Sequence, residues 1–180
     1  MIYKFLNKLF LGIWYSKNFI FRIISFLLLP LSIVYFVAFN LRTYFRKSHS
    51  FEIPIICIGN IVIGGSGKTS IALSLIKMLP DKKIVVLLKG YRGRLKGTIK
   101  VDKTKHSAID TGDEALLYAR VGTTYICSIR KDAIDTIIKI EKPDLIILDD
   151  GLQDSSINKS KSIVAINGRR GFGNKLLLPS

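Results

Sequence analysis

The sequence predicts an α/β protein in which helices cover both faces of a parallel sheet. Short apolar runs of the length of buried strands alternate with segments whose apolar residues recur at helical spacing. A glycine-rich stretch joins the first of these strands to the first of these helices. A long uncharged segment near the N-terminus precedes the whole pattern, so the sheet domain has a hydrophobic attachment.

That attachment, residues 1–41, is expected to associate with a membrane. Met1–Arg22 mixes aromatic, leucine and basic residues, which is typical of a helix lying at a membrane interface. Ile23–Leu41 holds 19 residues without a charge, and as a helix it would extend about 28 Å. Pro30 at its centre favours a kink, so a shallow insertion competes with a straight span. A cleavable signal peptide or a soluble core helix would show a similar apolar run, but no small-residue cleavage site follows Leu41.

Composition limits the function classes only loosely. The formal net charge of +15 suits nucleic acid, anionic lipid or a phosphorylated substrate, and charge alone does not separate them. Cys57 and Cys127 each lie in an apolar run, which indicates buried reduced thiols and not a disulfide framework or a metal site. The polar, basic residues 42–52 are predicted to link the membrane segment to a domain over residues 53–180.

The most informative stretch is Ile53–Leu79. Ile53–Ile58 reads as a buried strand, Gly59–Gly67 is too rich in glycine for regular structure, and Lys68 begins a helical pattern. Its apolar side is predicted to consist of Ile71, Ala72, Leu75, Ile76, Met78 and Leu79.

Strand, glycine loop and helix in this order are the context of a phosphate-binding P-loop. Backbone N–H groups of the loop and the helix N-terminus would hold a phosphate, Lys68 would reach the β- and γ-phosphates, and the Thr69 hydroxyl could ligate Mg²⁺. The strict motif has glycine at the position of Val62. We therefore predict binding of a nucleoside triphosphate by Val62, Ile63, Gly64, Gly65, Ser66, Gly67, Lys68 and Thr69.

Three further elements follow the P-loop unit. Ile84–Leu88 reads as a buried strand, and residues 89–97 form a basic loop before an edge strand at Thr98–Val101. This loop is either a solvated turn or a phosphate-holding segment built from Lys89, Arg92 and Arg94. Helix initiation is indicated at residues 111–120, where acidic first-turn residues, Asp113 and Glu114, could serve capping alone.

The last third repeats the strand–helix alternation. Thr124–Ile129 is predicted as a strand, Asp132–Ile140 as a helix, and Ile163–Ile166 as the final strand. Between this helix and the final strand, an apolar run that begins at Leu145 ends in Asp149 and Asp150. Carboxylates at the carboxyl end of a buried strand are where a P-loop enzyme presents its Mg²⁺ ligand, although a solvated turn would look the same.

Taken together, GNIVIGGSGKT, KGYRGR, TGDEALL, LDDGLQ and NGRRGFGNKLLLP resemble the tetraacyldisaccharide 4'-kinase family, the membrane-associated lipid A 4'-kinases of Gram-negative bacteria. The resemblance covers nearly the whole chain and implies ATP, Mg²⁺ and phosphoryl transfer to the 4'-hydroxyl of a tetraacyldisaccharide 1-phosphate, giving lipid IVA. It implies a glycolipid and the membrane as partners and no nucleic acid. Because a P-loop needs cytosolic ATP, the domain after Leu41 is expected at the cytoplasmic face of the inner membrane.

The resemblance also implies roles for single residues. Lys68 and Thr69 take the phosphate and Mg²⁺ roles, Asp113 matches the proposed base for the sugar hydroxyl, and Asp149 and Asp150 match the pair placed near Mg²⁺. Lys68, Asp113 and Asp150 are the expected catalytic residues. Gln153 belongs to the same motif as the aspartate pair.

The sequence departs from the family pattern at several positions, so functions other than the kinase reaction must also be considered. Asp154 stands where the family usually has His, Asn167 where it has Asp, and Lys89 where Arg is common. The family continues into a further α/β lobe beyond the point that corresponds to Ser180, so we expect a shortened nucleotide-binding chain. The chain could instead be a membrane-bound remnant that binds nucleotide without catalysis, or an unrelated membrane-anchored ATPase or GTPase. The absence of an N-K-x-D guanine motif argues against a GTPase.

Overall fold

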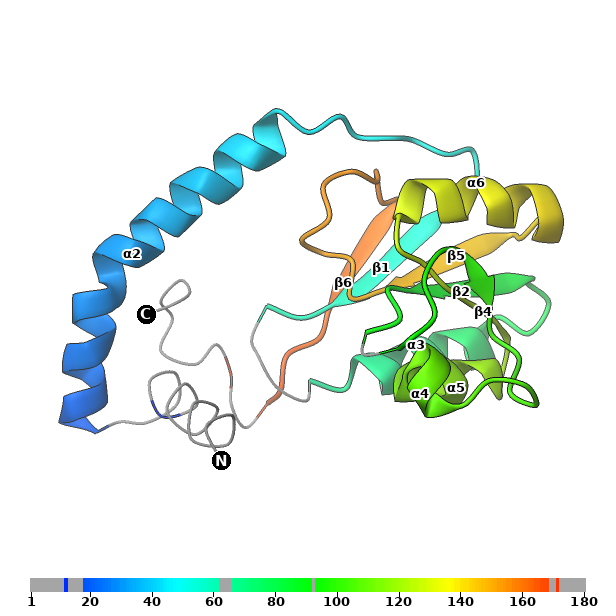
Figure 1. Ribbon diagram of the computed structural model, residues 1–180, viewed down its shortest axis with the longest axis horizontal. Helices are drawn as coiled ribbons and strands as arrows, with labels where there is room; N and C mark the ends of the chain where they lie inside the picture. Colours follow the sequence, from blue (N-terminus) through cyan, green and yellow to red (C-terminus); the bar gives the residue numbers. More distant parts are fainter. Residues whose placement is uncertain (1–11, 13–17, 62–65, 92, 169–170, 172–180) are drawn as a thin grey trace. The chain divides into compact units, whose positions relative to one another are not determined.

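The computed structural model describes residues 12, 18–61, 66–91, 93–168 and 171 (Figure 1). The chain divides into two compact units, of which one comprises Lys47–Ala165 and the other Met1–Arg46 with Ile166–Ser180. The sheet and every described candidate site residue lie within the first of these. The boundaries expected at 1–41, 42–52 and 53–180 stay a prediction.

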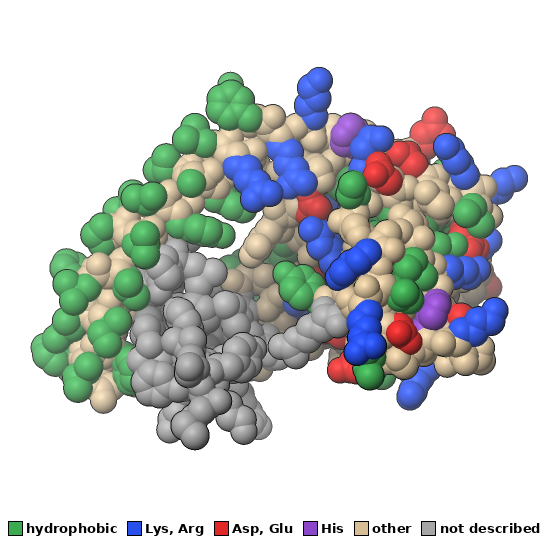
Figure 2. Space-filling view, in the orientation of Figure 1, with side chains coloured by type: hydrophobic (Ala, Val, Ile, Leu, Met, Phe, Trp, Pro, Cys, Tyr) green, Lys and Arg blue, Asp and Glu red, His purple; other side chains and the backbone are tan. Residues whose placement is uncertain are grey.

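Helix α2 (Phe19–Tyr44) contains the whole uncharged segment expected near the N-terminus. The Asn18 side chain caps it by accepting a hydrogen bond from the Ile20 N–H at 3.0 Å. Most of its large apolar side chains are exposed, and Figure 2 shows them as a continuous row along the helix. Among the described residues α2 is the one helix long and apolar enough to cross a membrane, judged by length and composition. Most of the interfacial helix expected at Met1–Arg22 lies outside the described residues.

Six strands form one sheet, in the spatial order β3-β4-β2-β5-β1-β6. All neighbouring pairs are parallel except β3–β4, which is antiparallel and places β3 at an edge as expected. The bounds are β1 (Ile55–Gly59), β2 (Ile84–Leu88), β3 (Ile99–Lys100), β4 (Thr123–Ile126), β5 (Leu145–Asp149) and β6 (Lys161–Val164). The central strands β2 and β5 are buried along their whole length, which is why they read as unbroken apolar runs in the sequence.

Helices cover both faces of this sheet, as the sequence predicts (Figure 1). Helix α6 (Arg130–Glu141) packs on one face through Ala133, Ile134 and Ile137. Helices α3 (Lys68–Met78) and α5 (Asp113–Ala119) pack on the other, and the single turn α4 (Ala108–Thr111) precedes α5. The α/β fold class inferred from the alternating pattern is therefore confirmed.

Two details of the packing concern predictions made from the sequence. Met78 was expected on the apolar side of α3, but its side chain is 76% exposed. At about 100° per residue, Met78 lies roughly 120° around the helix from Ala72, the buried residue of α3, so the prediction was wrong. Cys57 and Cys127 are buried free thiols, as expected, and burial raises the pKa of both.

Candidate nucleotide-binding site

The glycine loop leads from β1 into α3, and Lys68 is the first residue of that helix. Gly67 precedes it with a φ of +81°, a left-handed conformation that glycine adopts without strain. The Lys68 ammonium donates hydrogen bonds to Asn60 Oδ1 at 2.8 Å and to Asp150 Oδ1 at 3.1 Å. The Ser66 hydroxyl is buried and has no hydrogen-bond partner among the described residues. Residues 62–65 of the expected cradle lie outside the described residues.

The adjacent aspartates expected to hold a metal have different surroundings. Asp149, the last residue of β5, lies opposite Ile58 of β1 and is only 3% exposed. Its Oδ2 accepts a hydrogen bond from the Tyr118 hydroxyl at 3.0 Å, while its Oδ1 is buried without a partner among the described residues. The Asp150 side chain is 58% exposed and pairs with Lys68. The β1–β5 pairing thus brings Asp150 within reach of Lys68, the first residue of α3.

The pKa of Asp149 reflects this environment. Burial raises it from 3.8 to about 6, because the ionised carboxylate is poorly solvated. The Tyr118 hydrogen bond and the positive charge of Lys68 oppose that rise, and the negative charges of Glu114 and Asp150 add to it. The position therefore favours a compensating positive charge beside Asp149.

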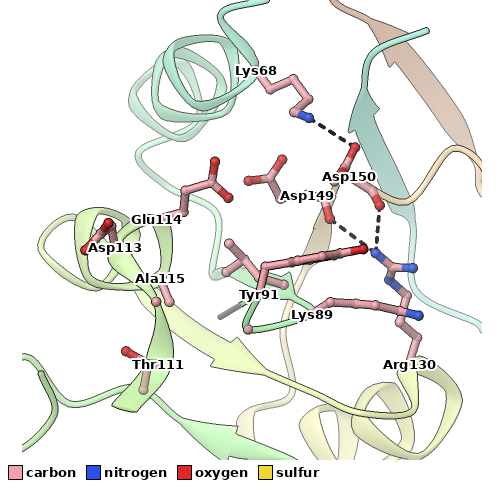
Figure 3. A pocket seen from close by; sticks show the side chains of 13 residues that line it. Lys68, Lys89, Tyr91, Thr111, Asp113, Glu114, Ala115, Arg130, Asp149 and Asp150 are labelled. Carbon is pink, nitrogen blue, oxygen red and sulfur yellow. Dashed lines mark hydrogen bonds and ion pairs between the residues drawn. The ribbon is translucent and has the colours of Figure 1, made fainter. Parts of the chain in front are cut away.

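A pocket with a volume of about 350 Å³ opens between these groups and the start of α5 (Figure 3). Figure 3 shows the Glu114 side chain extending towards Asp149, with Asp113 beside it at the helix N-terminus. The charged residues of its lining are Lys68, Lys89, Asp113, Glu114, Arg130, Asp149 and Asp150. The described catalytic and metal-binding residues predicted from the sequence therefore border one cavity, except for Thr69, the second residue of α3, which is not among its lining residues.

The basic loop of residues 89–97 is packed against α4, and this packing places it beside the pocket. Arg94 N–H donates to the carbonyl of Ile109 at 2.9 Å. Gly112, at the junction of α4 and α5, has a φ of +90°, and a side chain there would meet the Tyr91 carbonyl oxygen at 2.8 Å. Lys89 lines the pocket, whereas Arg94 is exposed and does not line it, and Arg92 lies outside the described residues.

Sequence reasoning missed two residues of this region. Tyr118 reads as one more large residue on the inner face of α5, and nothing in the pattern identifies its hydroxyl as a partner of Asp149. Arg130 begins α6, and its guanidinium donates to the carbonyl oxygens of Asp149 at 3.3 Å and Asp150 at 2.9 Å. A basic residue in the first turn of a helix is electrostatically unfavourable, which is a signal that could have identified Arg130.

Arg130 also accounts for the unusual Asp154. The two side chains form an ion pair at 2.9 Å and are 3% and 10% exposed. Burial raises the pKa of Asp154, but hydrogen bonds from Ser156 and Arg130 outweigh that effect and hold the pKa below its usual range. Asp154 is therefore an ionised anchor for the arginine that holds the aspartate turn.

This arrangement defines a class of protein, an α/β protein with a P-loop and an acidic strand end beside it. A family model described as Tetraacyldisaccharide-1-P 4'-kinase matches residues 24–180. The chain belongs to that family.

Similar proteins support the assignment. The chain is 37% identical to a tetraacyldisaccharide 4'-kinase of Rickettsia typhi over 169 residues, which are 93% of this chain and 51% of the relative. It is 38% identical to one of Parvibaculum lavamentivorans, over 86% of this chain and 45% of the relative. Its structure resembles the crystal structure of LpxK from Aquifex aeolicus in complex with ATP, with a TM-score of 0.69 and 32% identity over 76% of this chain and 47% of that one. The chain thus spans about half the length of the relatives it matches.

Proposed function

We propose that this chain binds ATP and transfers its γ-phosphate to the 4'-hydroxyl of a tetraacyldisaccharide 1-phosphate, forming lipid IVA. The observation that carries the proposal is the meeting of Lys68, Asp149 and Asp113 around one pocket at the carboxyl edge of the sheet. Membership of the family and the likeness to LpxK in complex with ATP support it.

Each residue has a role that follows from its charge and position. Lys68, now held by Asn60 and Asp150, would exchange these partners for phosphate oxygens of the nucleotide. Asp113 borders the pocket as an exposed carboxylate and would accept the proton of the sugar hydroxyl as it leaves. Positioning and charge neutralisation would supply most of the rate acceleration.

The residues present fit a magnesium ion. Asp149 Oδ1 is a buried carboxylate oxygen without a partner among the described residues, and a hard cation would satisfy it. Thr69 and Asp150 are the other candidate ligands. No group of three or more His, Cys, Asp or Glu side chains suited to a metal occurs in the described part of the chain, so the proposed ion would depend on nucleotide phosphates for its remaining ligands. Bound there, Mg²⁺ would neutralise charge on the transferring phosphate.

A second candidate is a membrane-bound nucleotide-binding protein without transfer activity. The relatives are named for the activity of whole proteins, of which this chain spans about half, so nucleotide binding and transfer are separate proposals for it. The two candidates share the binding site and differ only in the transfer step.

Binding and transfer should be measured separately on the full chain in mild detergent. We expect calorimetry to detect Mg-ATP binding and labelled ATP to phosphorylate tetraacyldisaccharide 1-phosphate. Lys68→Ala should abolish binding, whereas Asp113→Ala should preserve binding and lose transfer. Lys77→Ala, an exposed lysine in the last turn of the same helix, is the matched control and should change neither. Binding without transfer in the unmodified chain would establish the second candidate, and no binding would refute both.

We further propose that α2 anchors the chain in the inner membrane, with the sheet domain at the cytoplasmic face where ATP is available. The support is the length and exposed apolar surface of α2. The chain should remain with the membrane after alkaline extraction, and proteases added outside intact spheroplasts should leave the sheet domain uncut. Release by alkali or digestion from outside would contradict this placement.

A further inference from the structure

Tyr118 is a buried core residue whose hydroxyl group is not needed for packing. Its side chain is fully buried within the cluster of α3, α5 and the sheet, beside Ala115 and Ala72. A phenylalanine ring would fill nearly the same space. A buried hydroxyl costs free energy unless it is hydrogen-bonded, so its partners indicate why this position carries one.

The partner of the hydroxyl is a candidate Mg²⁺ ligand. Tyr118 donates its proton to Asp149 Oδ2 at 3.0 Å. Asp149 is the last residue of β5 and borders the pocket together with Lys68. The hydroxyl therefore fixes one of the two oxygens of this carboxylate.

This bond leaves one oxygen atom of Asp149 open. Oδ2 is occupied, and Oδ1 is buried without a partner among the described residues. A divalent cation binds through the lone pairs of such an oxygen, and groups that orient its ligands tune its affinity.

We propose that the Tyr118 hydroxyl is a positioning group that orients Asp149 for a divalent cation. It holds Asp149 Oδ2, so that Asp149 Oδ1 faces the ion. This inference rests on the proposed nucleotide-binding function and adds to it a residue outside the glycine loop and the aspartate pair.

The chain contains a matched control for the same chemical change. Tyr125 is also buried, and its hydroxyl also donates to a carboxylate, Glu141 Oε1, at 2.9 Å. Glu141 is already paired with Lys83 and Lys100 and borders no part of the pocket. Tyr125→Phe therefore removes a buried tyrosine–carboxylate bond away from the site.

The test compares nucleotide affinity with and without Mg²⁺ in the full chain, in mild detergent. Tyr118→Phe should weaken Mg-ATP binding by about tenfold or more, while affinity for ATP in excess EDTA stays as in the unmodified chain. Tyr125→Phe should leave both affinities unchanged. Titration with Mn²⁺ in the presence of ATP, followed by electron paramagnetic resonance, should show the same selective loss for Tyr118→Phe.

Two results would overturn the role of Tyr118. Equal Mg-ATP affinity in Tyr118→Phe and the unmodified chain would show that the hydroxyl does not orient Asp149 as a ligand. An equal loss of affinity with Mg²⁺ and in EDTA would show a general packing defect. Failure of the proposed function looks different, because the unmodified chain itself would then bind no ATP in either condition.

Discussion

Asp149 and Glu141 are two buried carboxylates of one sheet domain with opposite surroundings. Each accepts a hydrogen bond from a buried tyrosine, Tyr118 or Tyr125. Glu141 also pairs with two lysines, and its pKa is lowered, chiefly by the Lys100 hydrogen bond. Asp149 has one oxygen without a partner among the described residues, and burial raises its pKa to about 6.

The difference indicates that Glu141 stabilises the fold, whereas Asp149 has an oxygen available for a ligand. Removing a partner from a fully paired buried charge is strongly destabilising, whereas a half-paired buried charge already costs free energy until a ligand binds it. Helix α6 connects the two situations: Arg130 at its start holds the turn of Asp149, and Glu141 is at its end. Substitutions of Arg130, Glu141 and Asp149 should therefore differ in their effects on the free energy of unfolding.

The largest loss is expected for Arg130→Met. It removes the buried ion pair with Asp154 and the hydrogen bonds to the two carbonyls of the aspartate turn, which should lower the free energy of unfolding by about 3–5 kcal/mol. Urea titration of the full chain in non-ionic detergent, followed by circular dichroism, measures it. The neighbouring Lys131→Met removes only an exposed pair with Asp135 and should cost less than about 0.5 kcal/mol. Equal losses in the two variants would contradict the anchoring role of Arg130.

A smaller loss is expected for Glu141→Gln. The lysines that pair with Glu141 are 51% and 57% exposed, so solvent screens them, and losing the charge should cost about 1–2 kcal/mol. The same urea titration applies. A cost as large as that of Arg130→Met would mean that the Glu141 cluster is not screened in this way.

The Glu141 contribution should also depend on pH. Because the folded pKa lies below the ordinary value of 4.5, its stabilisation is complete above that value and is lost as the pH falls through the folded pKa. The difference in unfolding free energy between the unmodified chain and Glu141→Gln should be constant between about pH 6 and 8 and shrink below about pH 4.5. A difference that grows on acidification would show that folding raises the pKa of Glu141 instead of lowering it.

The smallest effect on stability is expected for Asp149→Asn, measured in EDTA. The amide keeps an oxygen for Tyr118 and removes a charge that burial disfavours, so the free energy of unfolding should stay within about 1 kcal/mol or rise. A loss of more than about 2 kcal/mol would place Asp149 with Glu141, as a carboxylate that holds the fold together.

Local patterns carried most of the fold prediction. Ile84–Leu88 was predicted with the observed bounds, because an unbroken apolar run between polar residues has few other interpretations. The predicted strand Thr124–Ile129 ends at Ile126 instead, and Ile163–Ile166 is shifted to Lys161–Val164. Where a strand ends depends on hydrogen bonds to neighbouring strands, and these are not visible in a single segment.

The site could be predicted from the sequence only where its function requires particular residue types at a fixed spacing. The glycine loop and the aspartate pair stand out because phosphate and metal binding need those residue types. Tyr118 and Arg130 do not, because each acquires its role from a partner more than 15 residues away in the chain. Their contacts result from the order of the strands, which the sequence alone did not predict.

Strand order also determines when the site can be completed. β1 precedes the other strands of the described sheet in the sequence and pairs with β5 and β6, which follow them. During synthesis its apolar residues therefore remain without these sheet neighbours until β5 and β6 have left the ribosome, and an exposed hydrophobic helix, α2, precedes them. Both segments are open to non-native contacts during that interval, as in other folds that depend on pairing between distant strands.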